Sequence, residues 1–358
     1  MCQQYEGKIE NKLNIIRDCS CNFLLSYAYP LSMAETSLSF LSWNNQNYIY
    51  HFFSYNKFRN MNSGIYDALE YGSNQRLPDQ IFQYDEIDYQ SLVPSDRIVD
   101  YLITMLNEHR YIIIFLDNKE LLSASNHFMH EYLIYGYNRK AQTFSSLYYI
   151  NHKYTFNTIP FNNLMYAYKS LIENIDCLDD IWRNKCIMTF KLNDAGINTL
   201  NYSPMIFREK MRKYIRGDAI DNIHLEDDVS IRTSTFGIKT TYGLSRYLVD
   251  LRNVDNRINY GQLYDIVKTI KLFLQHREGI LKKTMFYQDY TKNDLSLKLY
   301  RYKNVLSELK KIQLLMLKDY YNALNQPSLD AGKNLVKISE QLQQVYVHEC
   351  EIWDNITI

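Results

Sequence analysis

The sequence predicts an α+β protein in which an antiparallel sheet comes first and long helices follow. Between Tyr111 and Tyr154, β-branched and aromatic runs are separated by short breaks rich in Asn, Lys and Gly, a pattern typical of neighbouring strands. From Pro204 onward, apolar residues recur at the period of amphipathic helices. We therefore expect two domains, 1–195 around the sheet and 196–358 as an α-helical bundle.

The first domain is expected to contain a hairpin, a third strand and several flanking elements. The predicted strands are 111–117, 130–138, 143–150 and 186–192, and helices are expected after Pro94 and from Pro160. Apolar residues after Cys21 predict a further helix that Pro30 ends. Residues 44–80 are interrupted by glycine and proline, and we expect irregular strands and loops there, lining the approach to the cysteine.

The second domain is expected to consist of five helices, the last three long and amphipathic. Turn signals at 289–294 and 326–328 separate the long ones. The predicted ranges are 204–216, 239–252, 259–286, 295–325 and 328–354.

Composition excludes several classes of function. The 358 residues carry 40 basic and 40 acidic side chains, so no basic field indicates nucleic acid or a membrane surface as partner. The chain has neither a signal-peptide pattern nor an apolar run of about 18 residues, and we expect a cytoplasmic protein with reduced thiols. The six cysteines lack metal-ligand spacing, and no nucleotide-binding glycine motif occurs. We therefore expect neither a metal nor a cofactor.

Cys21 and His130 are the candidate catalytic pair. A cysteine at a helix N-terminus has its thiolate stabilised by the helix dipole, and backbone N–H groups there can bind an oxyanion. Cys19 is the alternative nucleophile, whereas Cys186 falls in an alternating strand and is expected to be packed. His130 begins a predicted strand, where an imidazole can accept the thiol proton. His127, in the preceding loop, is expected to be solvated or to bind substrate.

The segment His130 to Asn138, entered from a hydrophobic strand that ends in Asp117, resembles the histidine strand of papain-like cysteine enzymes of the bacteriocin-processing type. More specifically, it is similar to the butirosin-biosynthesis acyltransferase family, whose members have that fold in their N-terminal domain and also carry a helical C-terminal region. The resemblance implies a helix bearing Cys21 packed on an antiparallel sheet bearing His130.

The third catalytic group is where the sequence departs from this pattern. Related enzymes carry an Asp or Asn on the strand after the histidine, but here no carboxylate or amide occurs before Asn151. Tyr148 stands at the corresponding position and carries no charge at neutral pH. Asp117 ends the strand that pairs with the His130 strand, so it could supply the third group or merely cap the loop. A Cys-His dyad is the remaining alternative.

The resemblance implies ATP-independent transfer of an acyl group from a carrier-protein thioester, through a Cys21 thioester, to a small-molecule amine. Papain-like amide synthases of nonribosomal, thiotemplated natural-product biosynthesis, such as that of closthioamide, suggest the same reaction. The alternatives are a cysteine peptidase or amidase, and an inactive papain-like module that only binds. The amphipathic helices are equally consistent with an acceptor pocket, a carrier-protein dock or a homodimer interface.

Overall fold

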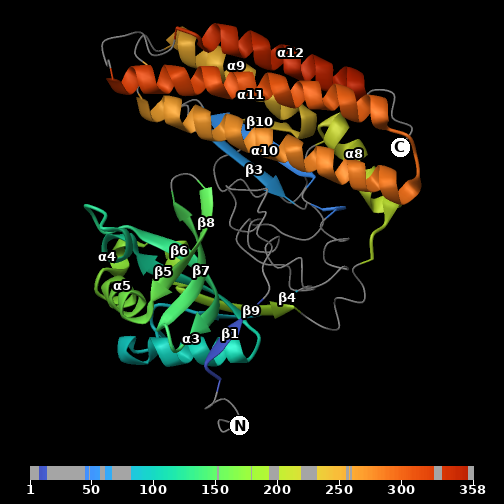
Figure 1. Cartoon of the computed structure of the whole chain (residues 1–358). Coiled ribbons are helices and arrows are strands. Elements are labelled where there is room, and N and C mark those ends of the chain that lie inside the picture. The colour runs from blue at the N-terminus through green and yellow to red at the C-terminus, as the bar shows by residue number, and fades with distance from the viewer. Residues whose placement is uncertain are drawn as a thin grey trace. The chain divides into compact units, whose positions relative to one another are not determined.

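The computed structural model describes residues 8–13, 45–47, 49–56, 61–66, 82–150, 153–178, 180–192, 201–218, 232–254, 258, 260–325 and 333–353 (Figure 1). The chain divides into two compact units. The first unit contains the described residues up to 13 and from 82 to 192, and the second contains those from 45 to 66 and from 201 to 353. The protein is α+β, as the sequence predicted.

The first unit is built on an antiparallel sheet. Among the described residues, seven strands take part, in the order β4-β9-β5-β6-β7-β8 with β1 also paired to β6. The four predicted strands are confirmed as β5, β6, β7 and β9, whereas β1, β4 and β8 are additional. The strands are β1 (Glu10–Lys12), β4 (Phe82–Ile87), β5 (Tyr111–Asp117), β6 (Met129–Asn138), β7 (Thr143–Ile150), β8 (Lys153–Pro160) and β9 (Ile187–Leu192).

Helices α3 and α5 pack on β5 and on each other, and this layer forms the core of the first unit. Both helices bury residues at helical spacing, for example Leu102 and Leu106 of α3 and Leu164 and Leu171 of α5. The expected helices after Pro94 and from Pro160 are thereby confirmed. The helical segments are η3 (Ser95–Arg97), α3 (Ile98–Asn107), α4 (Asn118–Leu122), α5 (Phe161–Glu173), η4 (Ile175–Cys177) and α6 (Asp180–Arg183).

The second unit combines helices with a small antiparallel sheet of order β10-β2-β3. Helix α10 packs against α11, α11 against α12, and α12 against α9, around one large apolar core. The elements are β2 (Tyr50–Asn56), β3 (Met61–Tyr66), α8 (Pro204–Arg216), β10 (Arg232–Phe236), η6 (Gly237–Lys239), α9 (Thr240–Val254), α10 (Tyr260–Thr291), α11 (Ser296–Asn325) and α12 (Leu335–Trp353).

This sheet changes two expectations. Strands β2 and β3 fall within 44–80, which we expected to line the approach to the cysteine, but they belong to the second unit. The second unit is therefore neither a continuous 196–358 segment nor purely helical. The reason is a long-range pairing: β2 is apolar and buried, with Phe52 and Phe53 inaccessible, and its edge bonds to β10. Local periodicity does not reveal such a partner.

Candidate functional site

The candidate site lies at the end of the hairpin formed by β5 and β6. The connection is not a simple loop, because Asp117 ends β5 and caps the short helix α4, after which the chain returns through His127 to β6. In the β5–β6 register Asp117 is opposite Met129, next to the returning segment. Residues on either side of the connection are thereby brought to one end of the sheet.

Asp117 is fully buried and accepts four hydrogen bonds. One carboxylate oxygen accepts from the backbone N–H groups of Lys119 (3.0 Å) and Phe128 (3.1 Å), and the other accepts from the Ser170 hydroxyl (2.7 Å) and the His127 ring (2.6 Å). Burial raises the pKa of Asp117, but these hydrogen bonds lower it by more, so the pKa lies below its ordinary value. Asp117 is therefore an ionised and firmly held carboxylate.

His127 is oriented by this carboxylate. Its Nδ1 faces Asp117, and its Nε2 lies 3.1 Å from the Lys119 Nζ. An ammonium group only donates hydrogen bonds, so Nε2 must be the acceptor nitrogen and Nδ1 the protonated one. The His127 side chain is 32% exposed, whereas that of Asp117 is inaccessible. A buried carboxylate thus holds a partly exposed imidazole in the tautomer that a general base requires.

His130 has a different carboxylate partner. Its Nδ1 lies 2.9 Å from the Glu131 carboxylate, and both side chains are largely buried. Burial lowers the pKa of His130, but the hydrogen bond and charge of Glu131 raise it by more, so the pKa is raised overall. In the register His130 is opposite Leu116, one position away from the Asp117 pair. Because successive side chains leave opposite faces of a strand, Asp117 is not placed to orient His130.

The sequence left open whether Asp117 orients His130, and the structure pairs Asp117 with His127 instead. We expected His127 to be solvated or to bind substrate; its imidazole is hydrogen-bonded to Asp117 and partly exposed, so it is not a freely solvated side chain. Asp117 does cap α4, as the second interpretation of this residue proposed, but the same side chain also binds His127. The loop segment between Asp117 and His127 is short, and this proximity in sequence was the available signal.

The other predicted groups are only partly placed. Cys21, Cys19 and Asn151 lie outside the described residues. Tyr148 is buried opposite Tyr132, and its hydroxyl accepts a hydrogen bond from Asn157 (2.8 Å). Cys186 is packed as expected, and burial raises the pKa of its thiol to about 12.

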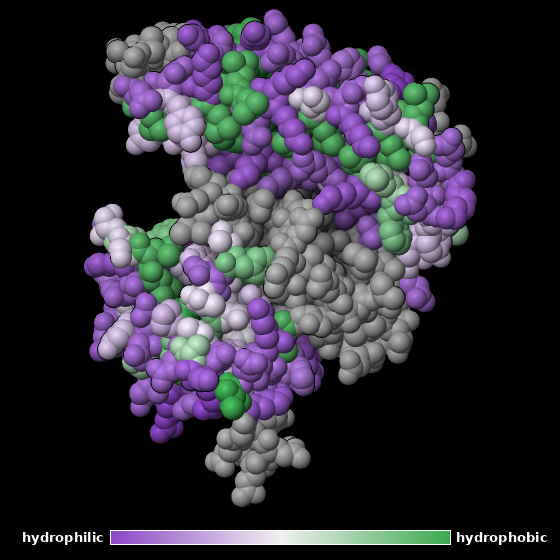
Figure 2. Space-filling view, viewed as in Figure 1, coloured by the Kyte–Doolittle hydropathy of each residue, from purple (hydrophilic) through white to green (hydrophobic). Residues whose placement is uncertain are grey.

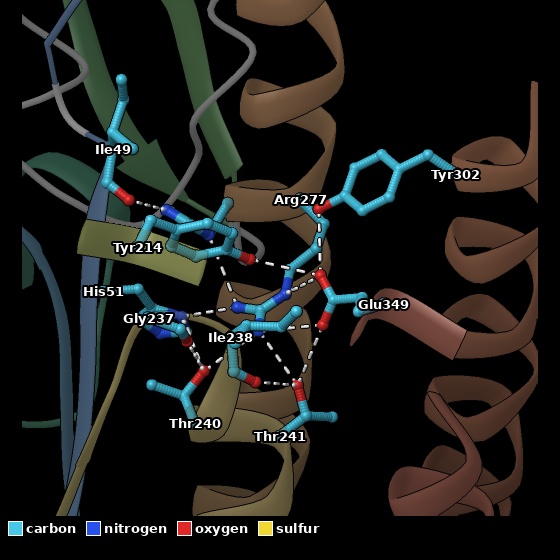
Figure 3. A network of polar contacts seen from close by, with 11 residues as sticks. Ile49, His51, Tyr214, Gly237, Ile238, Thr240, Thr241, Arg277, Tyr302 and Glu349 are labelled. Atoms are coloured by element: carbon cyan, nitrogen blue, oxygen red, sulfur yellow. Dashed lines mark hydrogen bonds and ion pairs between the residues drawn. The ribbon is translucent and has the colours of Figure 1, made fainter. Parts of the chain in front are cut away.

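The second unit contains a separate polar network, which is shown in Figure 3. At its centre the Arg277 guanidinium lies 3.3 Å from the Glu349 carboxylate, and both side chains are inaccessible. The hydroxyls of Tyr214 (3.2 Å) and Tyr302 (3.1 Å) donate to the same carboxylate. The buried charges are therefore paired and further hydrogen-bonded, as the low-dielectric interior requires.

Two buried neutral histidines complete this network, His51 as an acceptor and His276 as a donor. Arg277 donates to His51 Nδ1 (2.6 Å), and His276 Nε2 donates to the Ile49 carbonyl (2.9 Å). Burial, followed by neighbouring positive charge, holds the pKa of both rings well below the ordinary histidine value. Since these groups are inaccessible, we assign the network to the stability of the second unit.

Two further features bear on the kind of site. Within the described ranges, no three His, Cys, Asp or Glu side chains gather in a way that could hold a metal ion. No helix in that part of the chain combines the length and apolar character needed to cross a membrane.

Comparison with known proteins does not assign the chain to a family. No family model matches the sequence, and no curated protein is significantly similar to it.

Proposed function

We propose that this protein is a cysteine-dependent acyltransferase that forms amide bonds in thiotemplated natural-product biosynthesis. In this proposal the first unit is a papain-like domain, Cys21 is the nucleophile, and the acyl donor is a carrier-protein thioester. The sequence resemblance supports the nucleophile and the donor. The structure adds a carboxylate-held imidazole, and we infer that the protein acts in the cytoplasm without a cofactor.

The observation that carries the proposal is the Asp117–His127 pair. A general base needs a free nitrogen on the reactant side and a partner that fixes its tautomer and stabilises its charged form. Asp117 meets the second requirement through a 2.6 Å contact to Nδ1, and its own hydrogen bonds to Ser170 and the backbone keep it from turning away. We therefore assign the base to His127, and His130 remains the alternative.

Acylation would proceed in a balanced sequence. The His127 Nε2 accepts the Cys21 thiol proton, and the thiolate attacks the thioester carbonyl. The tetrahedral intermediate then breaks its bond to the phosphopantetheine sulfur, which takes the proton from the imidazolium and leaves as a thiol. One thioester replaces another, so no external energy source is needed.

Aminolysis reverses the roles of the same groups. The amine attacks the acyl-Cys21 carbonyl while His127 removes its proton. The cysteine sulfur then leaves and is reprotonated by the imidazolium, which yields an amide and the starting enzyme. The Lys119 ammonium has to leave Nε2 before either step, and its long flexible side chain allows this movement.

The experiment is intact-protein mass spectrometry after mixing the protein with simple and carrier-bound acyl thioesters. An adduct should form on the wild type and on Cys19→Ala, and should be absent from Cys21→Ala. His127→Ala should slow its formation about 10²- to 10⁴-fold, the range expected for loss of a general base. His348→Ala is the matched control, because this exposed histidine lies in the second unit beside Glu308.

The variants also separate the two candidate bases. If acylation slows in His130→Ala and not in His127→Ala, the base assignment is wrong although the function stands. Asp117→Asn should reproduce the loss seen in His127→Ala, with circular dichroism used to confirm folding. If no thioester acylates the protein, the acyltransferase proposal fails and a binding role for the first unit becomes the better explanation.

A further inference from the structure

Helix α11 has a regular pattern of side chains on its solvent-exposed face as well as on its buried face. Its core side includes Leu299, Leu309 and Met316, which are buried in the second unit. On the outer side, four residues spaced seven apart lie on one line along the helix, and the three large side chains among them are highly exposed; we call this line the column. The column consists of Tyr300 (66% exposed), Ser307, Leu314 (65%) and Tyr321 (57%). Three large exposed side chains on one line of a helix can pack against the apolar stripe of another helix.

Lysines flank this column on both sides, again at seven-residue spacing. Lys303 and Lys310 lie on one flank, Lys311 and Lys318 on the other, and all four are exposed. The only acidic residues of α11 are Glu308, which binds His348, and the buried Asp319. The outer face is therefore strongly basic, although the whole chain has no net charge.

One flank of the column opens into a groove between α10 and α11. The groove has a volume of about 570 Å³. Its walls include Lys282 and Lys303, and within it Lys310 lies 3.1 Å from Glu278. On the opposite flank a smaller groove of about 180 Å³, between α11 and α12, is lined by Lys311. In Figure 2 hydrophobic and hydrophilic residues interleave over α10 and α11.

Most of these lysines have no carboxylate partner in the part of the chain that the structure describes. Lys310 pairs with Glu278, whereas no described Asp or Glu lies within ion-pair distance of Lys303, Lys311 or Lys318. An acidic partner would supply these three lysines with carboxylates to pair with.

We propose that the outer face of α11 binds an acidic amphipathic helix of a partner protein. The partner's apolar residues would pack on Tyr300, Leu314 and Tyr321, and its Glu or Asp side chains would pair with the flanking lysines, as flanking charges do in coiled coils. This inference is independent of the proposed acyltransferase activity.

The charge pattern decides against two other occupants. A second copy of the chain using the same face would bring the lysines of the two α11 helices together, which is repulsive. A membrane surface requires an apolar stripe of Trp, Phe or Leu, whereas this column contains one leucine, one serine and two tyrosines. A helix with acidic flanks satisfies both the apolar column and the lysines.

The test uses the full-length protein and a fluorescently labelled synthetic peptide of about three heptads, with Leu in the seam and Glu at the flanks. Binding should be measured by fluorescence anisotropy at low salt. The variant Lys303→Gln, Lys310→Gln, Lys311→Gln, Lys318→Gln should weaken it at least about tenfold, since several charge pairs are lost together. The matched control Lys140→Gln, Lys169→Gln, Lys333→Gln, Lys337→Gln removes the same charge from other exposed positions and should leave affinity unchanged.

The contrary outcomes are distinct. Equal binding of a peptide with Lys in place of Glu would overturn the proposal, as would equal weakening by both quadruple variants or no binding at all. Vesicles of phosphatidylserine and phosphatidylcholine serve as a second probe. If the protein sediments with vesicles through these lysines and ignores the acidic peptide, the face is a membrane-binding surface instead. Thermal unfolding of each variant should match the wild type, which separates lost contacts from lost folding.

Discussion

Mild acid should destabilise the second unit, because its core contains two histidines that fold in the neutral form. Burial holds the pKa of His51 and His276 well below the ordinary value, whereas in the unfolded chain both titrate near 6.5. Below that pH the unfolded state takes up two protons that the folded state excludes. Stability is therefore fully present above about pH 6.5 and is lost as the pH falls.

The magnitude follows from linkage. At one pH unit below the unfolded pKa, each excluded proton costs about 1.4 kcal/mol. The two histidines together should therefore reduce the free energy of unfolding by about 2.7 kcal/mol between pH 7.5 and 5.5. Carboxylates contribute little in this window because most titrate below pH 5.

The assay is urea unfolding followed by the fluorescence of Trp353, which is buried in the second unit. Replacing Trp43 and Trp182 by Phe leaves Trp353 as the only tryptophan and keeps the first unit out of the signal. This matters because the raised pKa of His130 gives the first unit the opposite pH dependence.

A matched variant tests the cause. His276→Gln keeps a donor for the Ile49 carbonyl and removes one titrating ring, so the pH dependence should fall to about half. Unchanged stability between pH 7.5 and 5.5, or the full wild-type slope in the variant, would show that the two histidines do not set the pH dependence.

Three further predictions concern single residues. Arg277→Met should cost about 3–5 kcal/mol in urea unfolding, because it leaves the Glu349 carboxylate buried without a counter-charge, and the double variant with Glu349→Gln should recover part of that loss. Gly237→Ala should destabilise the second unit by at least about 2 kcal/mol, because Gly237 has φ +59° and an added Cβ would lie 2.0 Å from the Tyr214 backbone oxygen. An unchanged urea midpoint in this variant would contradict the prediction. Cys186 should alkylate at least about 100-fold more slowly than the exposed Cys177 at pH 8. Peptide mass mapping measures both rates, and equal rates would show that the Cys186 thiol is not buried.

The sequence by itself determined the elements with strong local patterns. The helix predicted at 204–216 coincides with α8, because Ser203 caps it, Pro204 begins it and Gly217 ends it in the left-handed conformation. Strands β5, β6 and β7 were likewise evident from alternating apolar and aromatic runs. Such signals depend on residues only a few positions apart, so they can be identified without knowing the tertiary structure.

Only the tertiary structure decided which groups meet. Strand β2 joins β10 across about half of the chain, and the buried Arg277 pairs with Glu349. Nearer in sequence, Asp117 bonds to His127 while His130 pairs with Glu131. Each pairing is set by packing and burial around it, because a charge or a strand edge removed from water must be satisfied by whatever the fold brings near. The sequence shows which charged side chains and strands are present, whereas packing in the folded core determines which of them are partners.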